Sequence, residues 1–167
     1  MRKTIRLERI KAWLLVFIIS LFISGLTAIP IDGELSFLLN YAPQSSGLHY
    51  WFSKVLSAFQ FTKQQYPFLL YGYDWLAFAH FVLAILFIGP YKNPVKNIWV
   101  IEFGLIACVL VIPFAFVAGY FRGIPIGWRL IDCSFGVFGF FLLGYCYSGL
   151  KQIFPSIPKN QVHHESF

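Results

Sequence analysis

Charged side chains are scarce in this sequence. Asp, Glu, Lys and Arg make up 12% of the 167 residues, against 58% hydrophobic and 20% aromatic residues. A water-soluble domain carries about twice that share of charged residues, so the composition favours a protein whose solvent is lipid. The net charge of +6 does not indicate nucleic-acid binding, because the basic residues are divided among the ends of apolar segments instead of forming one patch that neutralises phosphates.

The sequence also lacks the short motifs of several common catalytic sites. It has no glycine-rich phosphate loop, no His-Glu-x-x-His zinc motif and no Gly-x-Ser-x-Gly nucleophile elbow. Its cysteines include no Cys-x-x-Cys pair and fall at different expected membrane depths: Cys108, Cys133 and Cys146. A thiol–disulfide enzyme of the four-helix kind needs two thiols at one depth. That class of enzyme is therefore disfavoured.

Four apolar stretches are long enough to span a bilayer. A helix rises 1.5 Å per residue, so about 20 apolar residues cover a hydrocarbon core of ~30 Å. We expect transmembrane helices at about residues 12–29, 74–90, 98–120 and 127–149. The second is the shortest, because Gly89 and Pro90 are expected to end it.

The fold class predicted from these stretches is all-α, a polytopic membrane protein with four transmembrane helices in an antiparallel bundle. Short connections between the last three stretches predict that these helices are consecutive antiparallel neighbours. We expect a single transmembrane domain over residues 1–150 and a cytoplasmic tail over residues 151–167.

Lysine and arginine residues predict the orientation in the membrane. Nine of them lie on the side of the two termini, and four lie on the other side. Because cytoplasmic segments carry the excess, both termini are expected in the cytoplasm, with the chain in the plasma membrane, or in the inner membrane of a bacterium. The alternative, that the first helix is a cleaved signal peptide, is disfavoured because Leu26 stands three residues before the cleavage point after Ala28, where a small residue is needed.

The connection from residue 30 to residue 73 is then external, and it contains a helical pattern of its own. In GLHYWFSKVLSAFQF (residues 47–61) apolar residues recur at helical spacing: Leu48, Trp51, Phe52, Val55, Leu56 and Phe59. We expect an amphipathic helix in the plane of the membrane surface. We favour a lid packed on the bundle, since the helix carries little positive charge for lipid headgroups; a membrane-surface sensor or partner groove is the alternative.

Ionisable residues inside the spans are costly in lipid and are therefore the first candidates for function. His80 and Asp132 are expected ~9 Å and ~7.5 Å below the outer ends of their helices, with small residues on the same helical faces, as at helix contacts. We expect an outward-facing polar cluster in which Asp132 pairs with Arg129 and accepts a hydrogen bond from His80. Asp74 and Arg122 are further candidate members of this cluster.

Two other interpretations of these residues stay open. A buried group of this kind can serve only to fix the register of the helices. Glu102 is a separate, inner-side candidate, ~6 Å from the inner end of the third helix. Its carboxylate either reaches toward Lys96 at the membrane surface or forms an inner proton or ion site.

No cofactor or metal is predicted. A b-type haem generally needs two axial ligands, and His80 is the only histidine inside an expected span. A divalent metal held by His80 with Asp132, Asp74 and His49 is chemically possible, but the spacing of these residues is not diagnostic.

Three functions follow from these observations. We favour a non-catalytic accessory or ligand-binding membrane protein, whose polar cluster binds an anionic ligand or a helix of another membrane protein or of a second copy of the chain. The first alternative is a membrane-embedded enzyme acting on a lipid or quinone headgroup, with His80 as general base and Arg129 holding an anion. The second is a proton or ion pathway from His80 and Asp132 to Glu102. Enzymatic activity is left undecided, and no catalytic residue is assigned.

Overall fold

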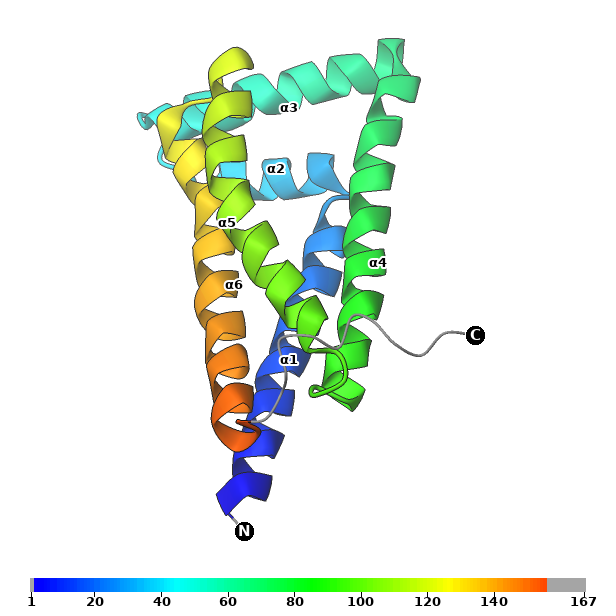
Figure 1. Ribbon diagram of the computed structural model, residues 1–167. Coiled ribbons are helices and arrows are strands. Elements are labelled where there is room, and N and C mark those ends of the chain that lie inside the picture. The colour runs from blue at the N-terminus through cyan, green and yellow to red at the C-terminus, as the bar shows by residue number, and fades with distance from the viewer. Residues whose placement is uncertain (1, 156–167) are drawn as a thin grey trace. The chain divides into compact units, whose positions relative to one another are not determined.

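The structure, a computed structural model, describes residues 2–155. This part of the chain is all-helical and contains no strand. Its helices are α1 (Arg2–Thr27), α2 (Ile31–Tyr41), α3 (Gly47–Gln65), the short 3-10 helix η1 (Pro67–Leu70), α4 (Tyr71–Lys92), α5 (Ile98–Phe121) and α6 (Ile126–Ile153) (Figure 1). Most of the expected tail, residues 156–167, lies outside the described residues.

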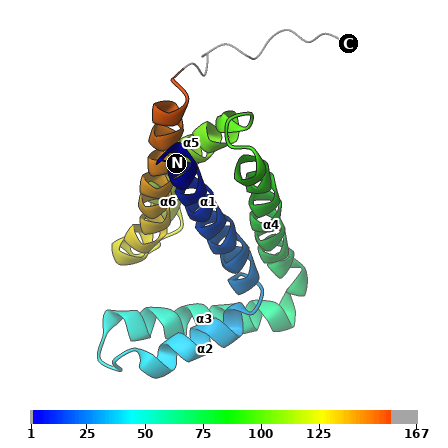
Figure 2. The same cartoon turned by 90° about the horizontal axis from the view of Figure 1, so that it is seen from below.

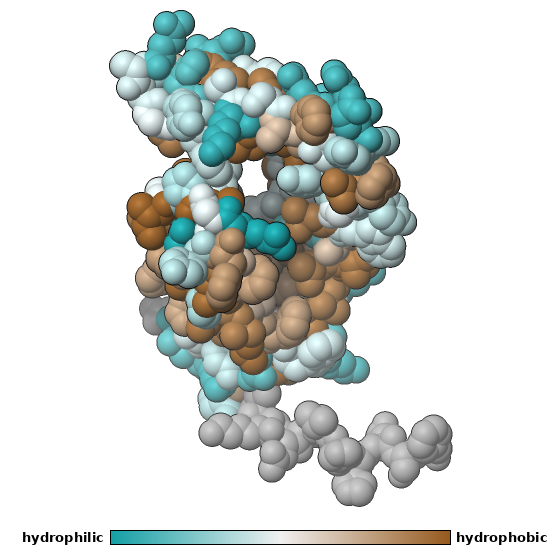
Figure 3. Space-filling view, turned by 90° about the horizontal axis from the view of Figure 1, so that it is seen from above, coloured by the Kyte–Doolittle hydropathy of each residue, from teal (hydrophilic) through white to brown (hydrophobic). Residues whose placement is uncertain are grey.

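Four helical segments are long and apolar enough to cross a membrane: Lys3–Thr27, Pro67–Lys92, Ile98–Phe121 and Ile126–Ile153. This confirms the prediction of an all-helical chain with four candidate membrane spans. Large apolar side chains on these segments are exposed, for example Phe114 at 71% and Phe141 at 72%, and hydrophobic residues cover much of the face seen in Figure 3. A helix whose outer face is apolar is suited to contact with lipid.

The second span is longer than its sequence predicts. Gly89 and Pro90 do not end α4, which continues to Lys92, and helical structure already begins at Pro67. Proline is tolerated here because it stands near the end of the helix and removes one backbone hydrogen bond, the one to the carbonyl of Leu86. The Gly89 carbonyl oxygen accepts two hydrogen bonds, one from the Asn93 backbone amide at 2.9 Å and one from the Asn97 side-chain amide at 3.1 Å.

The chain divides into two compact units. The first comprises the residues up to Ile18 together with those from Leu86 onwards, and the second comprises Ile19–Ile85. The boundaries fall inside α1 and α4, so each of these helices contributes residues to both units.

In the first unit, α5 and α6 pack along each other as a hairpin. A Cβ atom on Gly104 would lie 2.6 Å from the Leu143 side chain, and one on Gly136 would lie 2.7 Å from the Cys108 carbonyl oxygen. Later residues of α5 therefore face earlier residues of α6, as in an antiparallel pair. Neither position has room for a side chain, and glycine is what lets the two backbones approach.

The first half of α1 packs on the last turns of α6. The Cys146 thiol lies 3.8 Å from the Ile10 carbonyl oxygen, and the rings of Trp13 and Tyr145 meet edge to face at a centroid distance of 6.3 Å. The most deeply buried side chains of this unit are Ile10, Leu14, Phe87, Pro90, Val100, Ile101, Leu143, Cys146 and Leu150. Burial of these apolar side chains places the core of the unit among α1, α5, α6 and the end of α4.

In the second unit, α2 and α3 lie side by side (Figure 2). The helix predicted over residues 47–61 is present as α3, and the Ser46 side chain caps it by accepting a hydrogen bond from the His49 amide at 3.2 Å. Phe52 of α3 and Leu35 of α2 are buried. The half-buried residues of the predicted apolar stripe are Trp51, Val55, Leu56 and Phe59. Leu48 departs from this pattern, because it is 50% exposed.

Candidate functional site

The turn between α5 and α6 is shaped to hold an arginine. Gly123, with a φ of 64°, follows the C-cap residue of α5. The Ile124 amide donates back to the Gly119 carbonyl at 2.9 Å, and the Gly123 amide donates to the Tyr120 carbonyl at 3.2 Å. These two bonds are those of a helix end closed by a left-handed glycine. They leave the Ile124 carbonyl beside the first turns of α6.

Arg129 forms a hydrogen bond to the Ile124 carbonyl. Its Nε donates to the Ile124 carbonyl oxygen at 2.7 Å, and its methylene groups cover Gly119, where a Cβ atom would lie 2.7 Å from the Arg129 Cδ. Within residues 2–155 the two terminal guanidinium nitrogens have no hydrogen bond or ion pair. The methylene groups and Nε therefore fix the position of the side chain, while its two terminal nitrogens remain able to bind a carboxylate or phosphate in a bidentate manner.

The partner predicted for Arg129 is not the one observed. No ion pair joins Arg129 to Asp132 in the described part of the chain, although the two residues are three positions apart on α6. The physical reason is the turn at Gly123, which brings a backbone carbonyl to the guanidinium. Asp132 is half-buried. Arg122, the C-cap residue of α5, is exposed.

His80 lies in the second unit, where α4 meets the last turns of α1. A Cβ atom on Gly25 would lie 3.0 Å from the His80 Cβ and 2.9 Å from the Ala77 carbonyl oxygen. The small-residue face predicted for His80 is therefore a helix contact. The ring Nδ1 lies 2.8 Å from the Leu76 carbonyl oxygen. Because a carbonyl only accepts, Nδ1 donates, which leaves Nε2 as the acceptor of a neutral ring.

His80 and Asp132 belong to different units. The hydrogen bond predicted between them therefore stays a prediction.

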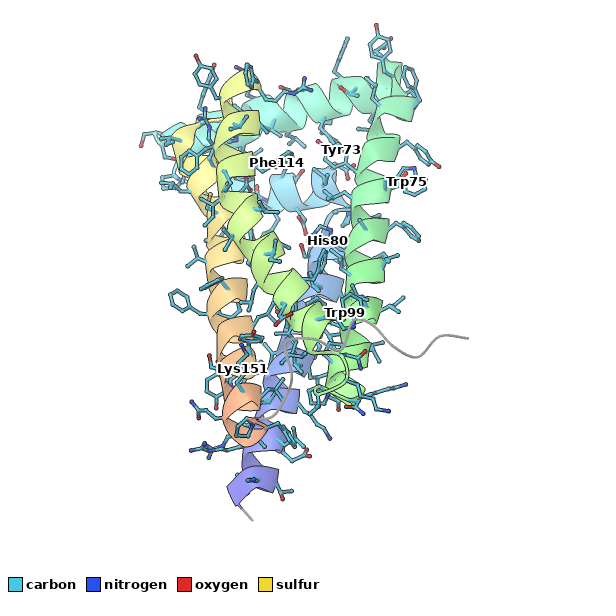
Figure 4. All side chains as sticks on the ribbon, in the orientation of Figure 1. Tyr73, Trp75, His80, Trp99, Phe114 and Lys151 are labelled. Atoms are coloured by element: carbon cyan, nitrogen blue, oxygen red, sulfur yellow. The ribbon has the colours of Figure 1, made fainter. Side chains whose placement is uncertain are left out.

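Asp74 does not share the face of α4 that carries His80. The two residues are six positions apart, which at about 100° per residue turns them ~120° away from each other around the helix. Asp74 instead lines a cavity of about 240 Å³ with three aromatic residues, Tyr71, Trp75 and Phe78. Figure 4 shows Trp75 on the opposite side of α4 from Tyr73.

Glu102 has a partner that sequence reasoning missed. Its Oε1 accepts a hydrogen bond from the Tyr147 hydroxyl of α6 at 2.7 Å, and the Lys151 ammonium lies 4.3 Å from the centroid of the Tyr147 ring. No ion pair between Glu102 and Lys96 occurs in residues 2–155, so the predicted contact with Lys96 is not observed. The spacing of Tyr147 and Lys151, one helical turn apart, was the available signal, but their meeting with Glu102 depends on the packing of α5 on α6.

Further polar chemistry in the described residues is limited. The three cysteines are free thiols, and no group of three His, Cys, Asp or Glu side chains within residues 2–155 could hold a metal ion. These observations define a helical protein with four candidate membrane spans, an arginine site at one end of the α5–α6 hairpin and a carboxylate–phenol pair toward the other. No protein-family model, curated protein or solved structure matches the chain.

Proposed function

We propose that this chain is a non-catalytic, multi-pass plasma-membrane protein that binds an anionic ligand through Arg129. The observation that carries the proposal is the way Arg129 is held. One bond from Nε to the Ile124 carbonyl and close packing on Gly119 fix the side chain, whereas its terminal nitrogens have no partner in residues 2–155. An arginine whose side chain is fixed and whose terminal nitrogens are unpaired is well suited to bidentate binding of phosphate or carboxylate.

The proposed topology puts this site outside the cytoplasm. Nine of the thirteen basic residues lie on the side of the termini, which supports cytoplasmic termini and an external segment over residues 30–73. The four spans are proposed to form an antiparallel bundle, which the order of contacts in the α5–α6 hairpin supports. The half-buried stripe of α3, opposite exposed Ser53, Lys54 and Ser57, supports an amphipathic helix that serves as an external lid.

His80 and Asp132 are proposed as further members of the outer cluster. Interhelical hydrogen bonds in membranes are worth about 0.6 kcal/mol on average. If the two residues meet, His80→Ala and Asp132→Ala should therefore show a coupling of that size in the thermal stability of the double variant. If the two substitutions instead have additive effects on thermal stability, His80 and Asp132 do not contact each other, and the proposed site consists of Arg129 without them.

The main experiment measures anion binding by the purified full chain. Native mass spectrometry from nanodiscs that contain phosphatidylglycerol should show the lipid retained by the native protein, and Arg129→Gln should reduce retention about tenfold, the value of a charge-assisted bond of ~1.5 kcal/mol. Arg129→Lys should give an intermediate loss, because it keeps the charge but not the fork. Lys54→Gln, on an exposed residue of α3, is the matched control. Equal losses in Arg129→Gln and Lys54→Gln would contradict the proposal.

One observation favours a second function. The hydrogen bond between Tyr147 and Glu102 puts two proton-carrying groups together on the inner half of the α5–α6 hairpin, as an inner station of a proton pathway would require. Proton uptake into proteoliposomes that contain the native chain, lost in Glu102→Gln, would support this alternative over the binding protein. A stoichiometric lipid or quinone that is chemically altered on incubation would instead support the membrane-embedded enzyme.

A further inference from the structure

In the first unit, the contact between α1 and α6 carries basic residues at one end and aromatic residues further along. The Arg6 Nη1 of α1 donates a hydrogen bond to the Gln152 Oε1 of α6 at 3.3 Å. Two helical turns deeper on both helices, the rings of Trp13 and Tyr145 meet edge to face. The first half of α1 and the end of α6 therefore run antiparallel, side by side in Figure 2. We call the surface formed by these four residues and Arg9 the α1–α6 seam.

Arg9 belongs to the same face of α1 as the two seam residues of that helix. Arg6, Arg9 and Trp13 stand at positions i, i+3 and i+7, which lie together on a helix surface. Both arginines are exposed, and Trp13 is 45% exposed. Arg9 has no side-chain hydrogen bond or ion pair to another described residue, and Arg6 has only the one to Gln152. Most of the guanidinium donors of the seam are therefore open.

No acidic side chain of the two helices belongs to the seam. Glu8, the one acid in the described residues of α1, is paired with Lys11 at 3.4 Å and stands about 100° around the helix from Arg9. The one acid of α6 is Asp132, ~30 Å along the helix from Gln152. The seam is therefore positive, and it favours a group of net negative charge over one that also carries an ammonium.

The level of the seam in the membrane indicates a lipid as the source of that negative charge. Arg6 and Arg9 lie in the first turns of the candidate span Lys3–Thr27, where a membrane helix passes from headgroups into hydrocarbon. Deeper on α6, one turn beyond Tyr145, the Phe141 side chain is 72% exposed. A phospholipid places its phosphate at the level of the arginines and its acyl chains beside such apolar side chains.

The orientation of the chain in the membrane does not by itself account for this arrangement. An excess of lysine and arginine on one side requires only that the charges lie near the ends of the spans. The seam instead puts two arginines on the flank of α1 that meets a second helix, next to exposed aromatic rings. Arginine binds phosphate in a bidentate manner, and basic pockets between spanning helices bind the headgroups of anionic lipids.

We propose that the α1–α6 seam binds a glycerophospholipid whose headgroup has a net negative charge, in the leaflet on the side of the N-terminus. Arg6 and Arg9 hold the phosphate, and the acyl chains lie along the aromatic side chains that follow. The seam is separate from the Arg129 site, because Arg129 and Gln152 stand near opposite ends of α6, ~34 Å apart along the helix. The proposal therefore does not depend on the proposed function.

The test identifies the lipid that contacts the seam. The full chain is placed in nanodiscs of equal parts phosphatidylglycerol and phosphatidylcholine, with a light-activated diazirine in the acyl chain of one lipid or the other. Mass spectrometry then compares the labelling of the peptides that contain Trp13 and Phe141. A basic residue near an anionic lipid is worth about fivefold in affinity, so we expect phosphatidylglycerol to label these peptides at least about fivefold more than phosphatidylcholine. Arg9→Gln should lower this ratio, and Arg6→Gln combined with Arg9→Gln should bring it to about one.

Matched controls separate this proposal from the others. Lys96→Gln removes the same charge from an exposed residue of the α4–α5 link and should leave the ratio unchanged. Arg129→Gln should also leave it unchanged, so failure of the anion site is distinguishable from failure of the seam. Circular dichroism and gel filtration identify any variant that fails to fold. Arg9→Gln removes no contact with another described residue, so it carries the test if the double variant does not fold.

Three results would overturn the proposal. The first is a native labelling ratio near one, and the second is an unchanged ratio in the folded variants that lack Arg9. The third is loss of the preference when millimolar inorganic phosphate is added at constant ionic strength, which would assign the seam to a soluble anion instead of a lipid.

Discussion

Lys63, in the last turn of α3, donates to Asp32, in the first turn of α2, with 2.7 Å between Nζ and Oδ2. The pair joins the two helices at sites where each charge also suits its helix, an acid near an N-terminus and a base near a C-terminus. The Lys63 side chain is 55% exposed and the Asp32 side chain 38%, so solvent screens the pair and it contributes little on its own. Because the ion pair joins α2 to α3, its loss can be used to test the contact between the two helices.

This pair predicts a pH dependence. The Lys63 ammonium, which hydrogen-bonds to the carboxylate, lowers the pKa of Asp32 from its usual value of 3.8. A lowered folded-state pKa means that the stabilisation is present above pH 3.8 and is lost as pH falls through the folded-state pKa. Asp32→Asn should therefore lower the melting temperature in detergent slightly at pH 7, and the difference from the native chain should close in acid and at 1 M salt. Glu34→Gln, in the same turn of α2, should have no such effect; a pH-independent loss in Asp32→Asn would point to packing instead of the ion pair.

Topology can be tested at the link between α2 and α3. Ser45 is exposed in that link, and the proposed orientation puts it outside the cell. In a background with Cys108, Cys133 and Cys146 replaced by alanine, Ser45→Cys should react with a membrane-impermeant maleimide on intact cells. Lys96→Cys, at an exposed residue of the α4–α5 link, should react only after lysis. The reverse pattern would invert the proposed orientation.

The α5–α6 contact predicts opposite outcomes for two glycines of one helix. A Cβ atom on Gly136 would lie 2.7 Å from the Cys108 carbonyl oxygen, which is backbone and cannot give way, whereas nothing lies within 4 Å of a Cβ on Gly144. Gly136→Ala should therefore cost about 1–3 kcal/mol of stability, while Gly144→Ala should be neutral or stabilising by up to ~1 kcal/mol. Thermal unfolding in detergent measures both. Equal effects would mean that α5 and α6 are not packed through Gly136.

The bond between Tyr147 and Glu102 predicts a small coupling. Tyr147→Phe and Glu102→Gln should each lower the melting temperature, and a double-mutant cycle should give an interaction of about 0.6 kcal/mol, the average for such bonds in membranes. Tyr145→Phe is the control, because Tyr145 packs its ring on Trp13 and its hydroxyl makes no side-chain hydrogen bond to another described residue. A coupling of zero would show that the phenol and carboxylate do not meet in the membrane.

The sequence was sufficient to predict the four candidate spans, because each is a long apolar run of the length that crosses a bilayer. The boundaries were harder. Pro90 suggested an end that the structure does not have, since a proline near the end of a helix removes only one hydrogen bond. The helix α2 was missed, although Asp32 and Glu34 after Pro30 form the acidic first turn typical of a helix start.

The candidate site was predicted less well, and the reason is geometric. Residue spacing on α6 placed Asp132 within reach of Arg129, but spacing within a helix cannot reveal that the turn at Gly123 offers Arg129 a backbone carbonyl. The Tyr147–Glu102 bond likewise depends on how α5 and α6 are packed. Spacing within one helix shows which residues can reach each other, whereas the turn at Gly123 and the packing of α5 on α6 decide which partners are used.

The division of α1 and α4 between two units constrains which insertions and deletions the chain can accept. The boundaries after Ile18 and Ile85 fall within continuous helix, where one added residue turns everything beyond it by about 100° and advances it by 1.5 Å. The same residue added in the 42–46 link, between two helices, changes only the length of a loop. Length variation among natural versions of this chain should therefore be confined to its links, and residues 19–85 should be exchangeable between two such versions only when both junctions keep the helical phase.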